Sequence, residues 1–260
     1  MSPFLSTVTW SGPKPIRKPC RRRRGVLLCG VAAGTALLMA LSVSGTSAAA
    51  SRTSGTPPSA PAAAGNPRDY TFLARVHGAP IHWNKCRVIG YRVNVWKSPR
   101  RAVPQVREAV QRLSARSRLR YRYLGKTTVF PSLRKHYPPS TRLIVGWTVP
   151  SRSREMPPGV AGVGGPEWVT GGRYAGAIRR GFVQLNRRVH LAPGFGAGPS
   201  SGILGTIGQV LMHELGHSVG LGHARGHREI MYRAATHKVA RWGAGDLTGL
   251  RQVGRARRCF

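Results

Sequence analysis

Acidic residues are scarce in this sequence. Its 260 residues include 7 Asp and Glu against 42 Lys and Arg, so the formal net charge is +35. Such an excess predicts attraction to anionic wall polymers, lipid head groups or acidic substrates, and non-specific binding to nucleic acid at low salt. The sequence lacks the zinc-finger, RNP-type and homeodomain patterns, so specific recognition of nucleic acid is not expected.

Long apolar runs are also scarce. Residues 26–43 are apolar but barely long enough to span a membrane. Arginines precede this run and Ala48-x-Ala50 follows it, which predicts a secretory signal over residues 1–50 with cleavage after Ala50. An uncleaved membrane anchor at 26–43 is the alternative, and the sequence does not separate Sec from twin-arginine export. Residues 51–68, rich in Ser, Pro, Ala and Gly, are expected to form a disordered linker before a folded domain at 69–260.

Cysteine is the third scarce component. Two of the four cysteines, Cys20 and Cys29, lie in the predicted signal, so cleavage would leave Cys86 and Cys259. An even number of cysteines in an oxidising compartment favours a disulfide between them. Free thiols, or thiols paired between molecules, are the alternative.

One segment of the remaining chain reads HELGHSVGLGH. His213 and His217 are four residues apart, so on a helix they share a face and can bind one zinc ion. Gly220 can adopt positive φ and end the helix, which lets His223 turn back as a third ligand. The fourth position on the metal would then be open for water or substrate. Glu214 follows the first ligand and can act as a general base on such a water.

This segment resembles the metzincin family of zinc endopeptidases, whose motif HExxHxxGxxH is followed by a methionine turn. Ile230-Met231-Tyr232 stands at the expected place, eight residues after His223. The resemblance implies that Met231 forms an apolar floor beneath the zinc and is not a ligand. Residues 245–250, GDLTGL, resemble the last helix of the matrixin subgroup, and Asp246 is expected to be its N-cap.

Apolar periodicity predicts an α/β domain. A strand, a helix and two further strands follow one another, as an α/β sheet with a crossover helix requires. The resemblance adds an α+β, metzincin-like plan: a twisted, mostly parallel sheet with an antiparallel edge strand, an active-site helix, the Met-turn and a C-terminal helix. The predicted elements are strands at residues 70–76, 88–96, 119–124, 142–149 and 178–185, helices at 101–117 and 203–219, and a closing helix that begins at Gly245.

A glycine-rich stretch after residue 159 is the candidate for the edge strand. By the same resemblance, Val160, Ala161, Gly162 and Val163 are expected to pair with the backbone of a substrate. Such pairing supplies affinity that tolerates many sequences. A plain surface loop is the alternative for this stretch.

Two features of matrixins are missing. Matrixins commonly hold structural calcium with clustered aspartates, but the aspartates here are Asp69 and Asp246 alone, so calcium is not expected to be required. The chain also has no recognisable cysteine switch. The sequence therefore predicts a secreted, monomeric endopeptidase with one catalytic Zn²⁺ that cleaves proteins or peptides. The alternative is a cationic envelope or polyanion-binding protein with a structural metal site.

Overall fold

The computed structural model describes residues 6–9, 64–198, 205–236, 238–255 and 259. The apolar run at 26–43, predicted to be a signal or an anchor, lies outside these residues. Among the helices that are described, none combines the length and the apolar character needed to cross a membrane. The boundaries predicted for the signal, the linker and the domain remain predictions.

A mixed sheet organises the domain, with the strand order β1-β7-β8-β6-β4-β5. β4 (Ile89–Asn94) pairs in parallel with β5 (Tyr121–Thr127) and β6 (Thr141–Thr148), and β6 pairs in parallel with β8 (Ile178–Asn186). β7 (Val160–Trp168) is antiparallel to β8. This arrangement confirms the predicted α/β fold with its mostly parallel sheet and antiparallel strand toward one edge.

The strand β1 (Ser6–Thr9) completes the sheet beyond β7. It is antiparallel to β7, with Thr7 opposite Val163 and Val8 opposite Gly162. The N-terminal segment of the chain therefore covers the outer edge of β7, and the sheet position that an extended peptide could fill is taken by the chain itself.

The prediction of one continuous strand at residues 70–76 is wrong. Arg75–Val76 forms β2, which pairs with β3 (Ala79–Pro80) in a separate two-stranded sheet. Phe72 instead makes an isolated antiparallel bridge to Leu221. The backbone before β2 thus finds its partners in residues 220–222, just after the helix α2 (Ile207–Ser218), and not in a sheet.

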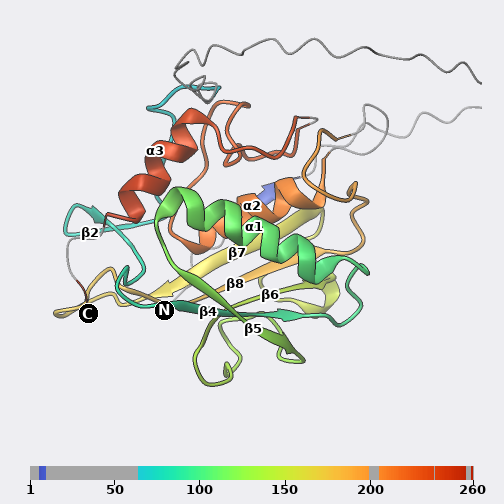
Figure 1. Ribbon diagram of the computed structural model, residues 1–260, viewed down its shortest axis with the longest axis horizontal. Coiled ribbons are helices and arrows are strands. Elements are labelled where there is room, and N and C mark those ends of the chain that lie inside the picture. Colours follow the sequence, from blue (N-terminus) through green and yellow to red (C-terminus); the bar gives the residue numbers. More distant parts are fainter. Residues whose placement is uncertain (1–5, 10–63, 199–204, 237, 256–258, 260) are drawn as a thin grey trace, which may run out of the picture. The chain divides into compact units, whose positions relative to one another are not determined.

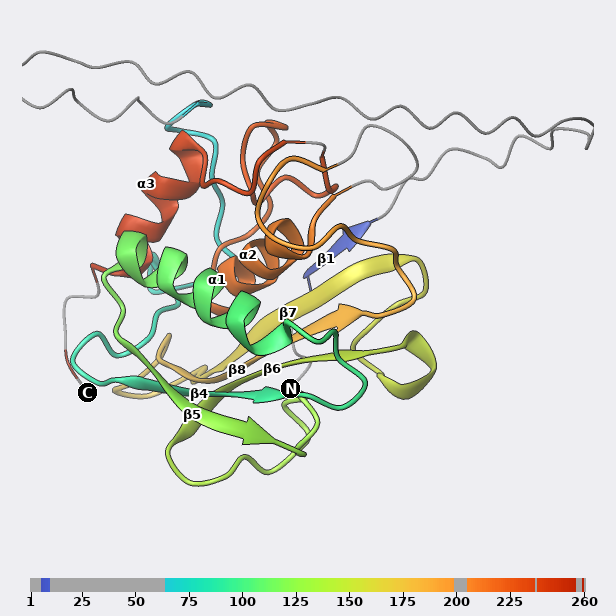
Figure 2. The same cartoon turned by 45° about the vertical axis from the view of Figure 1, so that its right-hand side comes forward.

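Two helices cover the same face of the sheet. Figures 1 and 2 show α1 (Ala102–Ser117) and α2 (Ile207–Ser218) side by side over the strands, with α3 (Ala244–Val253) nearby. A short 3₁₀ helix, η1 (Pro150–Arg152), follows β6. The predicted crossover helix is therefore confirmed as α1, which connects the parallel strands β4 and β5.

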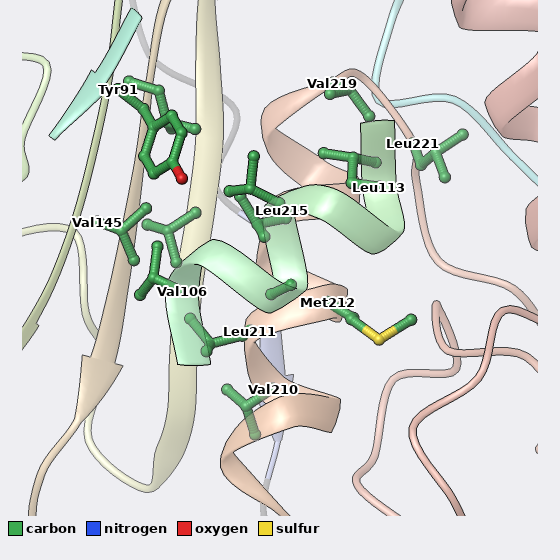
Figure 3. Close-up of a cluster of buried hydrophobic side chains, with 14 of the residues drawn as sticks. Tyr91, Val106, Leu113, Val145, Val210, Leu211, Met212, Leu215, Val219 and Leu221 are labelled. Carbon is green, nitrogen blue, oxygen red and sulfur yellow. The ribbon is translucent and has the colours of Figure 1, made fainter. Parts of the chain in front are cut away.

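The core lies between α1, α2 and the sheet. Val106 and Leu113 of α1 lie near Leu211 and Leu215 of α2, and Val145 of β6 lies on the sheet beside them (Figure 3). A fully buried leucine stabilises a fold by roughly 1.5–3 kcal/mol. All residues of α2 are buried, so other parts of the domain pack around the whole helix. This packing holds the side chains of α2 in fixed positions.

α2 begins later than the sequence predicted. Thr206 has an extended backbone, and its hydroxyl accepts from the amide of Gln209 while the Gln209 side chain accepts from the Thr206 amide. This capping box fixes the first turn at Ile207. Gly205, with φ of 154°, cannot continue a helix toward the N-terminus, so the start expected at residue 203 is wrong.

The N-cap of α3 also differs from the prediction. The cap is Gly243, and Asp246 lies three residues inside, where its carboxylate accepts from the Gly243 amide at 2.9 Å. Asp246 is therefore the acidic half of a capping arrangement, favoured at a helix N-terminus by the exposed amides there.

The cysteine pair is joined as predicted. A disulfide connects Cys86, just before β4, to Cys259 at the C-terminal end, with a Cα–Cα distance of 5.7 Å. It closes almost the whole domain into one covalent loop.

Candidate metal centre

The end of α2 brings the three motif histidines together. Gly220 has φ of 102°, its amide donates to the carbonyl of His217 at 2.9 Å, and the Leu221 amide donates to the carbonyl of Gly216 at 3.0 Å. These two bonds form a Schellman turn, which glycine permits because it lacks Cβ. The chain then reverses, and His223 comes to lie beside the two histidines of the helix, as the spacing predicted.

The ligand atoms converge on one point. The candidate nitrogens of His213, His217 and His223 all lie within 4.8 Å of one another. The Nε2 atoms of His213 and His217 are 2.9 Å apart, while their Nδ1 atoms lie 2.7 and 2.8 Å from the backbone carbonyls of Ile230 and Leu221. Each Nδ1 can therefore donate its proton to a carbonyl, which leaves the Nε2 lone pair for a metal.

The electrostatics of the cluster suit a cation. Burial lowers the pKa of His213 to about 3, helped by the neighbouring His223 and opposed by the Ile230 carbonyl. Burial and the other two histidines likewise hold the pKa of His217 well below its usual value. Both imidazoles are thus neutral at pH 7, which is the form that binds zinc.

The donor set fits a catalytic zinc and not a structural one. Within the part of the chain that the structure describes, this cluster has three members, all imidazoles. Three protein ligands leave a coordination position for water or substrate, whereas structural sites are closed by four. Among the residues that the structure describes, no fourth protein ligand of the kind that closes a structural site joins the cluster.

Glu214 lies fully buried beside this cluster. Neither of its carboxylate oxygens has a hydrogen-bond partner of normal geometry. Burial raises its pKa well above the usual value, and the nearby backbone of Gly164 offsets this only in part. A buried carboxylate with so few partners is unusual, because burying a polar group without full hydrogen bonding costs free energy. Because its pKa is raised, this carboxyl holds a proton more readily than an exposed glutamate does.

β7 makes room for this carboxylate. A Cβ atom at Gly162 would lie 2.9 Å from Oε1 of Glu214, and one at Gly164 would lie 2.5 Å from its backbone oxygen. The two glycines allow α2 to approach the strand closely. The predicted edge stretch Val160, Ala161, Gly162 and Val163 is therefore part of a strand beside Glu214, and the surface-loop alternative is wrong.

Met231 lies beneath α2. Its side chain is 2% exposed, and a Cβ at Gly216 would lie 2.3 Å from its sulfur. Gly216 immediately precedes His217, so the thioether packs under the segment that carries two ligands. This is the place expected for the Met-turn, and the role of the methionine as a floor for the metal remains a prediction.

Asp246 supports the Met-turn from α3. Its carboxylate accepts from the amides of Ile230 at 2.5 Å and Met231 at 3.2 Å. Burial raises the pKa of Asp246 to about 7, while its backbone donors act in the opposite direction. Since the carbonyl of Ile230 orients His213, the last helix is connected to the first ligand through this turn.

A small pocket opens beside His213. It is lined by Val210 of α2 and by Tyr232, Ala235 and Thr236 from the segment after the Met-turn. Gln209 donates to the carbonyl of Thr236 at 2.8 Å and so holds one wall in place. Residues between His223 and Asp246 therefore form one wall of this pocket.

Sequence patterns did not reveal Asp69 and Thr71. Both contact the loop that carries His223, through the hydroxyl of Thr71 and the carboxylate of Asp69. Their partners lie more than 150 positions further along the chain, so no local spacing could have marked them.

Comparison with protein families gives one finding for this region. Residues 198–253 match the family described as matrixin. The matched segment contains α2, the three histidines, the Met-turn and α3. A comparison with curated proteins gives no match.

Proposed function

We propose that this chain, a matrixin-type zinc metalloendopeptidase, hydrolyses proteins or peptides outside the cell with Glu214 as its general base. The observation that carries the proposal is the buried carboxylate of Glu214, which has no hydrogen-bond partner of normal geometry and lies next to three imidazoles whose nitrogens converge. A structural site has no use for an unpaired buried carboxylate.

His213, His217 and His223 would hold the zinc. When bound, zinc supplies a Lewis acid that makes water more acidic and stabilises negative charge on the carbonyl oxygen of the substrate. Glu214 takes the proton from the water as its oxygen bonds to the carbonyl carbon. The same carboxyl then gives that proton to the nitrogen of the breaking peptide bond, so no external acid is consumed.

The outer edge of β7 would align the substrate. β1 already pairs with this edge in antiparallel register, with Ser6 opposite Gly164 and Val8 opposite Gly162. Those two glycines are the ones that contact Glu214. An extended peptide in place of β1 would therefore pass directly beside the general base, bound through its backbone.

Disrupting β1 is expected to raise the peptidase activity of the full-length chain. Proline cannot donate to a sheet ladder, so Thr7→Pro combined with Val8→Pro should release the edge of β7. We expect a several-fold increase in kcat/KM toward a quenched peptide, with the intact N-terminus confirmed by mass spectrometry. Thr7→Ala with Val8→Ala keeps both amides and should stay near wild type. Equal activity of the proline variant and wild type would show that β1 and substrate do not compete.

Export of the protein would also free the outer edge of β7. Cleavage after Ala50 removes Ser6–Thr9 and leaves the β7 edge to substrate. Secretion is supported by the signal-like N-terminus and by the disulfide, which is typical of oxidising compartments. Independence from calcium, a monomeric state and non-specific binding to anionic polymers remain predictions.

A further inference from the structure

The backbone of His223, the proposed third zinc ligand, is held in place differently from that of His213 and His217. His213 and His217 are on a buried helix, but His223 follows the helix end, in a loop that contains Gly222 and Gly226 as well as Gly220. Glycine-rich backbone has much conformational entropy to lose on ordering. The loop therefore needs partners outside itself to present His223 at a fixed position.

The strap, which we define as Asp69–Leu73, supplies those partners through its backbone. The amide of Leu73 donates to the carbonyl of Gly220 at 2.9 Å, and the amide of Gly222 donates to the carbonyl of Thr71 at 2.9 Å. Between them, Phe72 and Leu221 form an antiparallel bridge. The loop before His223 is thus one side of a short ladder whose other side is the strap.

Thr71 also contacts the third ligand residue itself. Its hydroxyl donates to the backbone carbonyl of His223 at 2.8 Å. A Cβ at Gly222 would lie 2.4 Å from this hydroxyl oxygen, so the close approach depends on glycine at that position. Of the side chains in the strap, this hydroxyl is the one that fixes the backbone of His223 directly.

Asp69 holds the loop on the other side of His223. Its Oδ1 accepts from the amide of Arg225 at 2.8 Å, and its Oδ2 accepts from the amide of Gly226 at 2.5 Å. Hydrogen bonds to a charged acceptor are stronger than neutral ones. The strap therefore holds the chain on both sides of His223, through backbone bonds at residues 220 and 222 and through Asp69 at residues 225 and 226.

We propose that Thr71 and Asp69 are positioning residues for the third zinc ligand, and that the strap determines how long the metal is retained. No residue of the strap belongs to the three-histidine cluster, and its side-chain bonds go to the backbone at residues 223, 225 and 226, so it acts on the cluster through that backbone. Outer partners that orient a ligand typically change metal affinity by about 10–100-fold when they are lost. The proposal rests on the zinc site of the proposed function but not on peptide hydrolysis.

Zinc release from the Thr71→Val variant tests this directly. Valine keeps the shape and the backbone amide and carbonyl of residue 71 but removes the hydroxyl. The purified full chain, loaded with one zinc, is mixed with excess chromogenic chelator, and the rate of zinc transfer is recorded. We expect release about tenfold faster than wild type. Thr71→Ser restores the donor and should release zinc close to the wild-type rate.

Thr248→Val is the matched control. Thr248 likewise donates its hydroxyl to a backbone carbonyl, that of Ala244 at 3.0 Å, but within α3. Its loss should leave zinc release unchanged. Asp69→Asn provides a second variant, since an amide has one oxygen to accept where the carboxylate has two, and its release rate should also rise.

Thermal unfolding separates positioning from general stability. If the strap positions His223, Thr71→Val lowers the gain in Tm on adding zinc more than it lowers the Tm of the metal-free protein. Wild-type release rates in both Thr71→Val and Asp69→Asn would overturn the proposal. So would an equal loss of Tm in the metal-free and zinc-loaded forms.

Discussion

Zinc-loaded protein carrying Glu214→Gln is expected to hydrolyse peptides at least about a hundredfold more slowly than wild type, because general acid–base catalysis contributes about 10²–10⁴-fold. Glutamine has nearly the same shape, so the packing of residue 214 against Gly162 should persist. It cannot accept the proton of the attacking water. The fall should therefore be in kcat, with zinc content unchanged at one per chain.

Glu108→Gln is the control for this substitution. Glu108 is an exposed residue of α1 whose carboxylate pairs with Arg112 four residues later, and exposed pairs of this kind contribute little to stability. Its replacement should leave kcat and KM unchanged. If the Glu214→Gln protein binds zinc fully and still retains more than half of the wild-type kcat, Glu214 is not the base.

Removing the disulfide is expected to have the largest effect on stability. Cys86 and Cys259 are separated by 173 positions, and the chain-entropy treatment gives about 5 kcal/mol for a loop of this length. The paired change Cys86→Ser and Cys259→Ser should lower the free energy of unfolding by about that amount, because the unfolded chain gains freedom while the core between α1, α2 and the sheet is unchanged.

Denaturant unfolding of the zinc-loaded protein measures this effect. The midpoint should fall markedly, and wild type treated with a reducing agent should behave like the double variant. A loss below about 1 kcal/mol in both cases would mean that the covalent loop does not restrict the unfolded state, contrary to the estimate for so long a loop.

The arrangement of the three histidines could be predicted because it depends on residues that are close in sequence. The helical period places His213 and His217 on one face, and Gly220 provides the left-handed turn that returns His223. Rules about neighbouring residues are sufficient where a few of those residues determine the backbone conformation. The strands β4, β5, β6 and β8 and the helix α1 were predictable for the same reason, since the local pattern of their residues matches the element that they form.

The supporting contacts could not be predicted because they join distant segments. The hydroxyl of Thr71 and the carbonyl of His223 are 152 positions apart, and no periodicity connects them. The contact of Gly162 with Glu214 likewise depends on how closely α2 packs on β7. Packing between elements decides these positions, and it becomes visible only when the elements are assembled.

The errors at the helix starts have a related cause. The apolar pattern continues upstream of α2, but Gly205 and the capping box of Thr206 and Gln209 end the helix there. At α3, an aspartate at the third helical position resembles an N-cap in sequence. Only the bond from the Gly243 amide to Asp246 identifies the true cap.

Peptide cleavage during a zinc titration of the metal-free protein tests the central claim most directly. Chelation should abolish cleavage of a diverse peptide mixture, and activity should return in proportion to added Zn²⁺ until one equivalent per chain is bound. Cleavage that persists in the metal-free protein, or a chain that binds one zinc and cleaves no peptide in the mixture, would contradict the account.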